Sequence, residues 1–270
     1  RAEMQKEIPM LGGAAGMQNI ESTPVGFSEV QLEETDRMVL DRLEMTDEMI
    51  DINNEISFMF KEKDWFRERG LPWKLGYLFY GPPGTGKSSF ARGLAERQQV
   101  PIVLIDLAEM DNDELRNCWM QIQGFAPAIV LIEDIDAVFK GRENVSAEGE
   151  LTFDCLLNVL DGAQKAEGMV VIITTNHPEV LDAALWKFEE KSQTAAESLE
   201  EIGTRPGRID RALELKLLPD ANKLSIAKRI AGADKAVALV QAGKNDSAAQ
   251  FQERCRREAV REKMKQRLVK

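Results

Sequence analysis

The chain has 270 residues, of which 43% are hydrophobic and 30% are charged, and its formal net charge is −11. This composition is typical of a folded globular protein and excludes an intrinsically disordered chain. The acidic balance argues against a protein that coats nucleic acid, because phosphate binding needs a concentrated basic surface.

The first 70 residues precede the predicted core. Residues 1–27 hold several glycines and prolines and are predicted to form a flexible lead-in. From 28 to 70 we expect an amphipathic helical segment of one or two helices, ended by the pair Gly70 and Pro72. Its apolar residues recur at helical spacing, most clearly Met45, Met49, Ile52, Ile56 and Met59.

After residue 70, short β-rich runs alternate with helical patterns. The candidate strands are Tyr77–Tyr80, Ile102–Leu107, Ile129–Ile132, Val170–Thr174 and Ala212–Leu217. The helical patterns between them lie at about 87–98, 112–123 and 151–161. Such alternation predicts an α/β fold, a parallel sheet with helices on both faces, over 71–219. Residues 220–270 are helical and rich in Ala, Lys and Arg, which predicts a small second domain.

A glycine-rich segment directly follows the first of these strands and opens a helix, as a phosphate-binding loop requires. It consists of Gly81, Pro82, Pro83, Gly84, Thr85, Gly86, Lys87 and Ser88, with Ser89 next to it. Its N–H groups and the helix dipole favour phosphate. We expect Lys87 to reach the β- and γ-phosphates of ATP and the Ser88 hydroxyl to bind Mg²⁺. The alternative is a glycine-rich turn that matches by chance.

The apolar strand 129–132 ends in two acids, Glu133 and Asp134, which is a Walker B pattern. A buried strand would deliver these carboxylates to the sheet edge beside the phosphate loop. One could organise Mg²⁺ and the other could polarise the attacking water. The alternative is a pair of acids in a solvated turn.

The strand 170–174 leads into Asn176, whose neutral amide would point toward the γ-phosphate and the attacking water. Asn176 is therefore a sensor candidate, with an ordinary turn residue as the alternative. His177 is the single histidine of the chain, and the sequence offers no metal partner for it. We assign His177 to local structure.

In order and spacing, GPPGTGKS at 81–88, IVLIED at 129–134, TTN at 174–176 and TRPGRID at 204–210 resemble the AAA family. This resemblance implies a P-loop NTPase fold with a C-terminal helical lid, a Mg²⁺-dependent ATPase, a homo-oligomeric ring of six or seven subunits, and a protein substrate. It also implies that Arg205 and Arg208 are arginine fingers, which stabilise phosphoryl charge in a neighbouring subunit. The alternative is a pair of surface arginines in a turn.

A narrower resemblance is carried by RGLPW at 69–73, GYLFY at 76–80, LLNVLDG at 156–162 and TTNHPEVLDAAL at 174–185. These strings are similar to the mitochondrial AAA chaperones that move the folded Rieske iron–sulfur protein during cytochrome bc complex assembly. That subfamily also has Glu-Asp where most AAA proteins have Asp-Glu. By position, Glu133 then organises magnesium and Asp134 is catalytic, and the shorter Asp134 side chain leaves the reverse assignment open.

The sequence departs from the family pattern at three places. After the strand ending at Leu107, residues 108–112 contain no aromatic residue of the kind that threading motors use to grip a chain. A charged insertion, 186–203, precedes Arg205. It is a tolerated surface loop, a contact for a partner, or a segment that regulates the placement of the arginine fingers. The second sensor arginine of the lid is not identifiable, because 247–250 reads SAAQ at its expected place.

Three hypotheses of function follow. The first is a ring-forming AAA ATPase that couples ATP hydrolysis to remodelling or translocation of a protein. The second is a nucleic-acid loader or regulator of the same superfamily, supported only by the basic helix end at 254–270, which is otherwise a solvated helix face. The third is an assembly scaffold that ATP switches and that hydrolyses slowly.

Location is predicted from the cysteines and the apolar runs. Cys118, Cys155 and Cys255 lack the spacing of a zinc site or a disulfide framework, so we expect buried or incidental thiols in a reducing compartment. The longest apolar runs are strand-sized, far short of the roughly 20 residues that span a bilayer. We therefore expect no membrane span and a cytoplasmic location, or an organellar matrix if an N-terminal anchor is absent from this chain.

Overall fold

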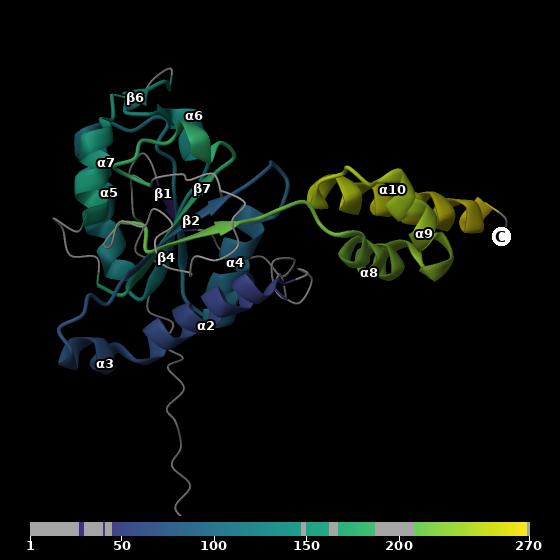
Figure 1. Ribbon diagram of the computed structural model, residues 1–270, viewed down its shortest axis with the longest axis horizontal. Helices are drawn as coiled ribbons and strands as arrows, with labels where there is room; N and C mark the ends of the chain where they lie inside the picture. Colours follow the sequence, from purple (N-terminus) through teal and green to yellow (C-terminus); the bar gives the residue numbers. More distant parts are fainter. Residues whose placement is uncertain are drawn as a thin grey trace, which may run out of the picture.

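The computed structural model describes residues 27–29, 40, 45–146, 150–161, 167–186 and 208–268. Its centre is a six-stranded sheet of order β1-β3-β4-β7-β2-β8 (Figure 1). The strands are β1 (Phe27–Glu29), β2 (Leu75–Tyr80), β3 (Ile102–Ile105), β4 (Ala128–Ile132), β7 (Met169–Thr175) and β8 (Arg211–Glu214). The five strands from β3 to β8 are parallel to one another, which confirms the predicted α/β class.

Helices cover both faces of the sheet, and each face has its own apolar cluster. Successive residues of β4 alternate between the clusters, so that Val130 faces α5 and α7 while Leu131 faces α2 and α4. A strand that is buried on both sides requires such a continuous apolar run. The helices are α2 (Asp47–Lys61), α3 (Lys63–Glu68), α4 (Lys87–Gln98), α5 (Asn112–Ile122), α6 (Ile135–Val138) and α7 (Phe153–Asp161), with short 3₁₀ turns at Gln123–Phe125 and Pro178–Val180.

The N-terminal segment differs from its predicted form. Strand β1, at Phe27–Glu29, pairs antiparallel with β3 at the edge of the sheet, where helical periodicity from residue 28 had been expected. A three-residue edge strand forms through pairing with its neighbour, and it is too short to show an alternating pattern in the sequence. Helix α2 begins only at Asp47, where the hydroxyl of Thr46 accepts a hydrogen bond from the Met49 N–H at 3.3 Å.

Helix α2 is fastened to the sheet by apolar packing and by side-chain hydrogen bonds. Ile52, Ile56 and Met59 are fully buried against one face of the sheet. The Tyr77 hydroxyl on β2 donates to a carboxylate oxygen of Glu55 at 2.8 Å. This helix therefore stabilises the strand that leads directly into the glycine-rich loop.

The C-terminal helices form a separate small core beside the sheet (Figure 1). They are α8 (Asp220–Ala231), α9 (Ala233–Ala242) and α10 (Ala248–Leu268). Ile226, Ala236 and Phe251 are buried where the three helices meet. A small two-stranded sheet, β5 (Phe139–Lys140) and β6 (Glu143–Asn144), lies after α6. None of the described helices is both long and apolar enough to cross a membrane.

Candidate active site

The glycine-rich segment forms the connection between β2 and α4, which is the strand–loop–helix context that the sequence predicted. Gly81, Gly84 and Gly86 have φ of 136°, 75° and 102°, a region that other residues rarely adopt. Thr85 closes the loop by donating from its hydroxyl to the carbonyl of Pro82 at 2.9 Å. The loop thus wraps around the N-terminus of α4, where N–H groups and the helix dipole favour an anion.

Lys87 is the first residue of α4, and its side chain turns back under the loop. The ammonium donates to the carbonyls of Gly81 at 2.8 Å and Pro82 at 3.2 Å, and to Oδ1 of Asn176 at 2.7 Å. Burial lowers the pKa of Lys87, and the carboxylates of Asp134 and Asp136 oppose that effect. Lys87 is therefore a buried cation held by oxygens from two strand ends.

Asn176 joins the lysine to the acid that follows β4. Its Nδ2 donates to Oδ1 of Asp134 at 3.0 Å while its Oδ1 accepts from Lys87. The Asp134 N–H in turn donates to the hydroxyl of Thr174 at 3.0 Å. The ends of β2, β4 and β7 are thereby connected through the chain Lys87–Asn176–Asp134.

Asp134 adopts a left-handed backbone, with φ 47° and ψ 52°. A residue with a side chain pays about 1 kcal/mol for this conformation, and such strain gathers at functional sites. The turn separates the two predicted acids. Asp134 enters the lysine network, whereas Glu133 lies beside α4, with its carboxylate 3.7 Å from the Arg92 guanidinium.

Asp136 is a site residue that the sequence reasoning missed. One of its carboxylate oxygens accepts from the Thr175 hydroxyl at 2.7 Å and from the Asn176 N–H at 3.0 Å. It therefore fixes the main chain of the sensor candidate. The signal in the sequence is a third acid two positions after Asp134, beyond the Walker B pair.

The start of α10 also reaches the phosphate loop. The Ala249 N–H donates to the carbonyl of Gly84 at 3.0 Å. Ser247 Oγ lies 2.7 Å from the position that a Cβ on Gly84 would take, so Gly84 lacks room for a side chain. Residues 247–250, where no sensor arginine was found in the sequence, thus close the loop with a helix N-terminus.

Among the described residues, no group of three or more His, Cys, Asp or Glu side chains is arranged to hold a metal ion. Mg²⁺ bound with a nucleotide takes most of its ligands from phosphates and water and only one or two from protein. Ser88 is half-buried at the second position of α4. Glu133 is partly exposed and only loosely paired, so its carboxylate is accessible.

The structure describes one of the two predicted arginine fingers, Arg208. Arg205 lies outside the described residues. Arg208 makes a two-pronged contact with Asp161 at the end of α7, with Nη2 to Oδ2 at 2.6 Å and Nε to the other oxygen. Its Nη1 also donates to the carbonyl of Ala184. In the single chain, the Arg208 guanidinium is therefore bound by groups of its own subunit.

Comparison with known proteins identifies the family. A model of the "ATPase family associated with various cellular activities (AAA)" matches residues 77–195, which include the glycine-rich loop, β4 and β7. The probable mitochondrial chaperone bcs1 of Schizosaccharomyces pombe is 36% identical over 164 residues, covering 59% of this chain and 32% of that protein. The chain therefore contains an AAA domain.

Other relatives of this AAA chain include the mitochondrial chaperone BCS1 of Bos taurus, 39% identical over 158 residues, covering 54% of this chain and 32% of that protein. The ATP-dependent zinc metalloprotease FtsH of Lancefieldella parvula is 35% identical over 176 residues, covering 62% of this chain and 24% of that protein. The chain spans about a third of the length of the BCS1 relatives. The predicted resemblance to a mitochondrial AAA chaperone is confirmed.

The predicted cytoplasmic location is wrong. The BCS1 relatives are mitochondrial chaperones and point to mitochondria. The prediction used the unpaired cysteines as a sign of a reducing compartment. All three thiols are buried in the structure, so the fold explains why they are unpaired without reference to any compartment.

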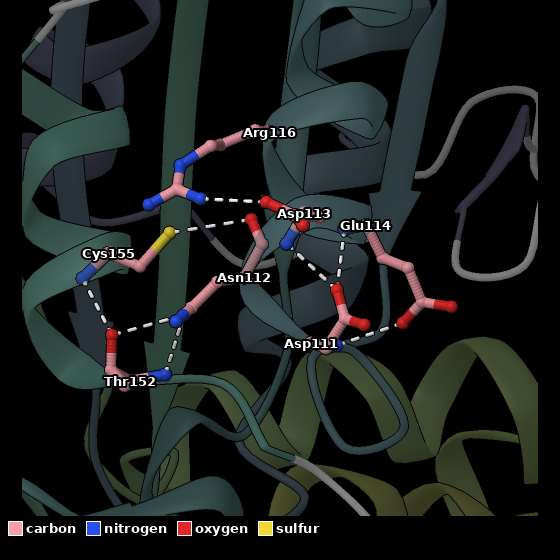
Figure 2. A network of polar contacts seen from close by, with 7 residues as sticks. All are labelled: Asp111, Asn112, Asp113, Glu114, Arg116, Thr152 and Cys155. Atoms are coloured by element: carbon pink, nitrogen blue, oxygen red, sulfur yellow. Dashed lines mark hydrogen bonds and ion pairs between the residues drawn. The ribbon is translucent and has the colours of Figure 1, made fainter.

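The loop after β3 of this AAA domain contains no aromatic side chain. Asp111 caps α5 by accepting from the N–H groups of Asp113 and Glu114, each at 2.8 Å, and its own N–H donates to the Glu114 carboxylate (Figure 2). Oδ1 of Asn112 accepts from the N–H and hydroxyl of Thr152, at 2.9 and 3.0 Å. The loop therefore ends in a helix cap that is tied to the segment leading into α7.

Proposed function

We propose that this chain is the ATP-hydrolysing part of a ring-forming AAA protein that remodels or translocates a protein substrate. The observation that carries the proposal is the hydrogen-bonded chain Lys87–Asn176–Asp134, which brings a phosphate-binding cation, a neutral amide and a carboxylate to one sheet edge. The mitochondrial chaperones among the relatives support a protein as the substrate. In this proposal residues 71–219 form the large ATPase domain and residues 220–270 form its lid.

The residues divide the chemistry of phosphoryl transfer between them. The loop 81–86 and the N-terminus of α4 bind the phosphates through main-chain N–H groups, and Lys87 neutralises charge on the β- and γ-phosphates. Asp134 accepts a hydrogen bond from the attacking water and thereby orients it. Asn176 positions the Asp134 carboxylate and the Lys87 ammonium relative to each other. Ser88 and Glu133 are the residues that would hold Mg²⁺, which would further neutralise phosphate charge.

The proposal includes a second subunit that completes the site. Arg205 and Arg208 would each supply a guanidinium to the nucleotide of a neighbouring subunit. For Arg208 this requires release of Asp161 and of the Ala184 carbonyl, which bind it in the single chain. Assembly into a ring of six or seven subunits would then exchange an ion pair within one chain for a contact between chains.

The basic end of α10 gives little support to a nucleic-acid machine. Arg256 and Arg257 both pair with Glu253 on the same helix, and Arg261 pairs with Glu258. Paired guanidinium groups are less available to phosphates than free ones. We therefore expect DNA to leave the ATPase rate unchanged at low salt.

The test is the steady-state ATPase rate of the whole chain and of three variants. Lys87→Ala and Asp134→Asn are expected to lose activity, and Lys140→Ala, which removes an exposed lysine outside the site, is expected to keep it. Mixing Lys87→Ala with Arg205→Ala subunits should restore part of the activity at interfaces that regain a complete site. Hydrolysis by Lys87→Ala at the wild-type rate would refute the assigned site, and a lack of rings in electron micrographs with a non-hydrolysable ATP analogue would refute the assembly.

A further inference from the structure

The lid contains a fully buried lysine that belongs to none of the motifs above. Lys223 on α8 has no exposed surface and lies among the apolar residues of the lid, with its ammonium 5.6 Å from the centre of the Phe251 ring. A buried ammonium is costly unless it is hydrogen-bonded. The ammonium donates to two main-chain carbonyls, those of Gly243 at 2.8 Å and Lys244 at 2.7 Å.

These carbonyls lie at the end of α9, where the negative end of the helix dipole favours a cation. They also begin the turn that leads to α10, which we call the lid turn and define as residues 243–247. Only two residues beyond it, Ala249 donates to Gly84 in the phosphate loop. The partners of Lys223 thus fix main chain that leads directly to the nucleotide-binding loop.

The lid turn is held from other sides as well. The Asp246 N–H donates to the Gly243 carbonyl at 3.0 Å, and the Asp246 carboxylate accepts from Arg254 of α10 at 2.6 and 3.1 Å. A Cβ on Gly243 would lie 2.6 Å from the Phe251 ring, so the turn is closely packed against this side chain. Lys223 on α8 and Arg254 on α10 thus both hydrogen-bond to the lid turn.

We propose that Lys223 is a positioning residue for the nucleotide site, acting through the lid turn to set the N-terminus of α10 on the phosphate loop. The inference rests on the proposed function, since it requires that Gly84 belong to an ATP-binding loop. It predicts that loss of the ammonium loosens the lid turn, so that the N-terminus of α10 no longer closes the loop. ATP affinity falls, while the reacting groups at Lys87 and Asp134 are untouched.

The decisive variant is Lys223→Met, which keeps an unbranched side chain only one atom shorter than lysine and removes its hydrogen-bond donors. The KM for ATP and the Kd of a fluorescent ATP analogue should rise about tenfold. This factor corresponds to about 1.4 kcal/mol, near the lower end of the free energy that one hydrogen bond to a charged group contributes. The kcat should change by less than about twofold. Lys223→Arg retains donors that can reach carbonyls and should bring KM back toward the wild-type value.

Two further variants separate positioning from general stability of the lid. Lys235→Met removes the ion pairs of Lys235 with Glu258 and Glu262, between α9 and α10, without touching the lid turn, and should leave KM unchanged. Ala249→Pro removes the N–H that donates to Gly84 and is tolerated in the first turn of a helix. It should raise KM as Lys223→Met does, and the double variant should be no worse than Lys223→Met alone.

An unchanged KM in Lys223→Met overturns the inference, as does an equal rise of KM in Lys235→Met. If Lys223→Met gives no folded protein, Ala249→Pro and Lys223→Arg decide the question, and an unchanged KM in Ala249→Pro overturns the inference. A wild-type chain that binds no nucleotide overturns the proposed function and this inference with it. Equal affinities of wild type and Lys223→Met overturn the inference alone.

Discussion

Replacement of Asn176 by Ala removes the amide that connects the Lys87 ammonium to the Asp134 carboxylate. Lys87 loses one of three oxygens, and because its ammonium is buried, water does not simply replace that partner. A hydrogen bond to a charged group contributes about 1.5–3 kcal/mol. Asp134 also loses a donor, but this residue is exposed, so water compensates for that loss. We therefore assign the whole cost to the lysine side.

A cost of about 1.5–3 kcal/mol in the transition state corresponds to a fall in kcat of roughly 10- to 150-fold. The assay is phosphate release under saturating ATP, with nucleotide affinity measured separately. The affinity should change by less than about threefold, because the loop amides that bind phosphate are unaltered. His177→Ala is the matched control, since the side chain of this neighbour is 63% exposed and its Nδ1 lies 2.9 Å from the Glu179 carboxylate. A kcat of Asn176→Ala equal to that of His177→Ala would refute the reasoning.

Three other measurements test the structure. Asp161→Asn should lower the melting temperature by about 2–4 °C, because the partly exposed ion pair with Arg208 contributes roughly 1 kcal/mol to stability. An unchanged melting temperature would show that the pair is not formed. Because burial raises the pKa of Cys118 to about 12, this thiol should react with a thiol reagent at mildly alkaline pH only after unfolding, and rapid reaction of the native chain would contradict its burial. Gly81→Ala should destabilise the fold by about 3 kcal/mol or more in denaturant titrations, because its Cβ would lie 2.3 Å from a main-chain carbonyl oxygen. Gly124→Ala is the control, since a Cβ there meets open space, and it should leave the stability unchanged.

The sequence allowed the sheet and the phosphate loop to be predicted because both depend on local patterns. Apolar runs such as 129–132 have to be continuous when a strand is buried on both faces, and the predicted helix at 87–98 coincides with α4. The glycines of the loop are required by backbone conformations that few other residues adopt.

The features that escaped prediction depend on contacts between segments far apart in the chain. Strand β1 exists through its pairing with β3, and Asp136 reaches Thr175 across 39 positions of sequence. The contact of Ala249 with Gly84 joins the C-terminal helices to the loop after β2 and has no local signature. The pairing of Arg208 with Asp161 could not be inferred either, since a motif indicates a residue type and not its partner.

The docking of α10 on the phosphate loop has a mechanical consequence. This helix has 21 residues and is therefore about 30 Å long. Because its first turn sits on Gly84, a tilt of only about 10° at that end would carry the far end through about 5 Å. A small rotation of α10 at the glycine-rich loop would therefore appear as a movement of several ångströms at the other end of the helix.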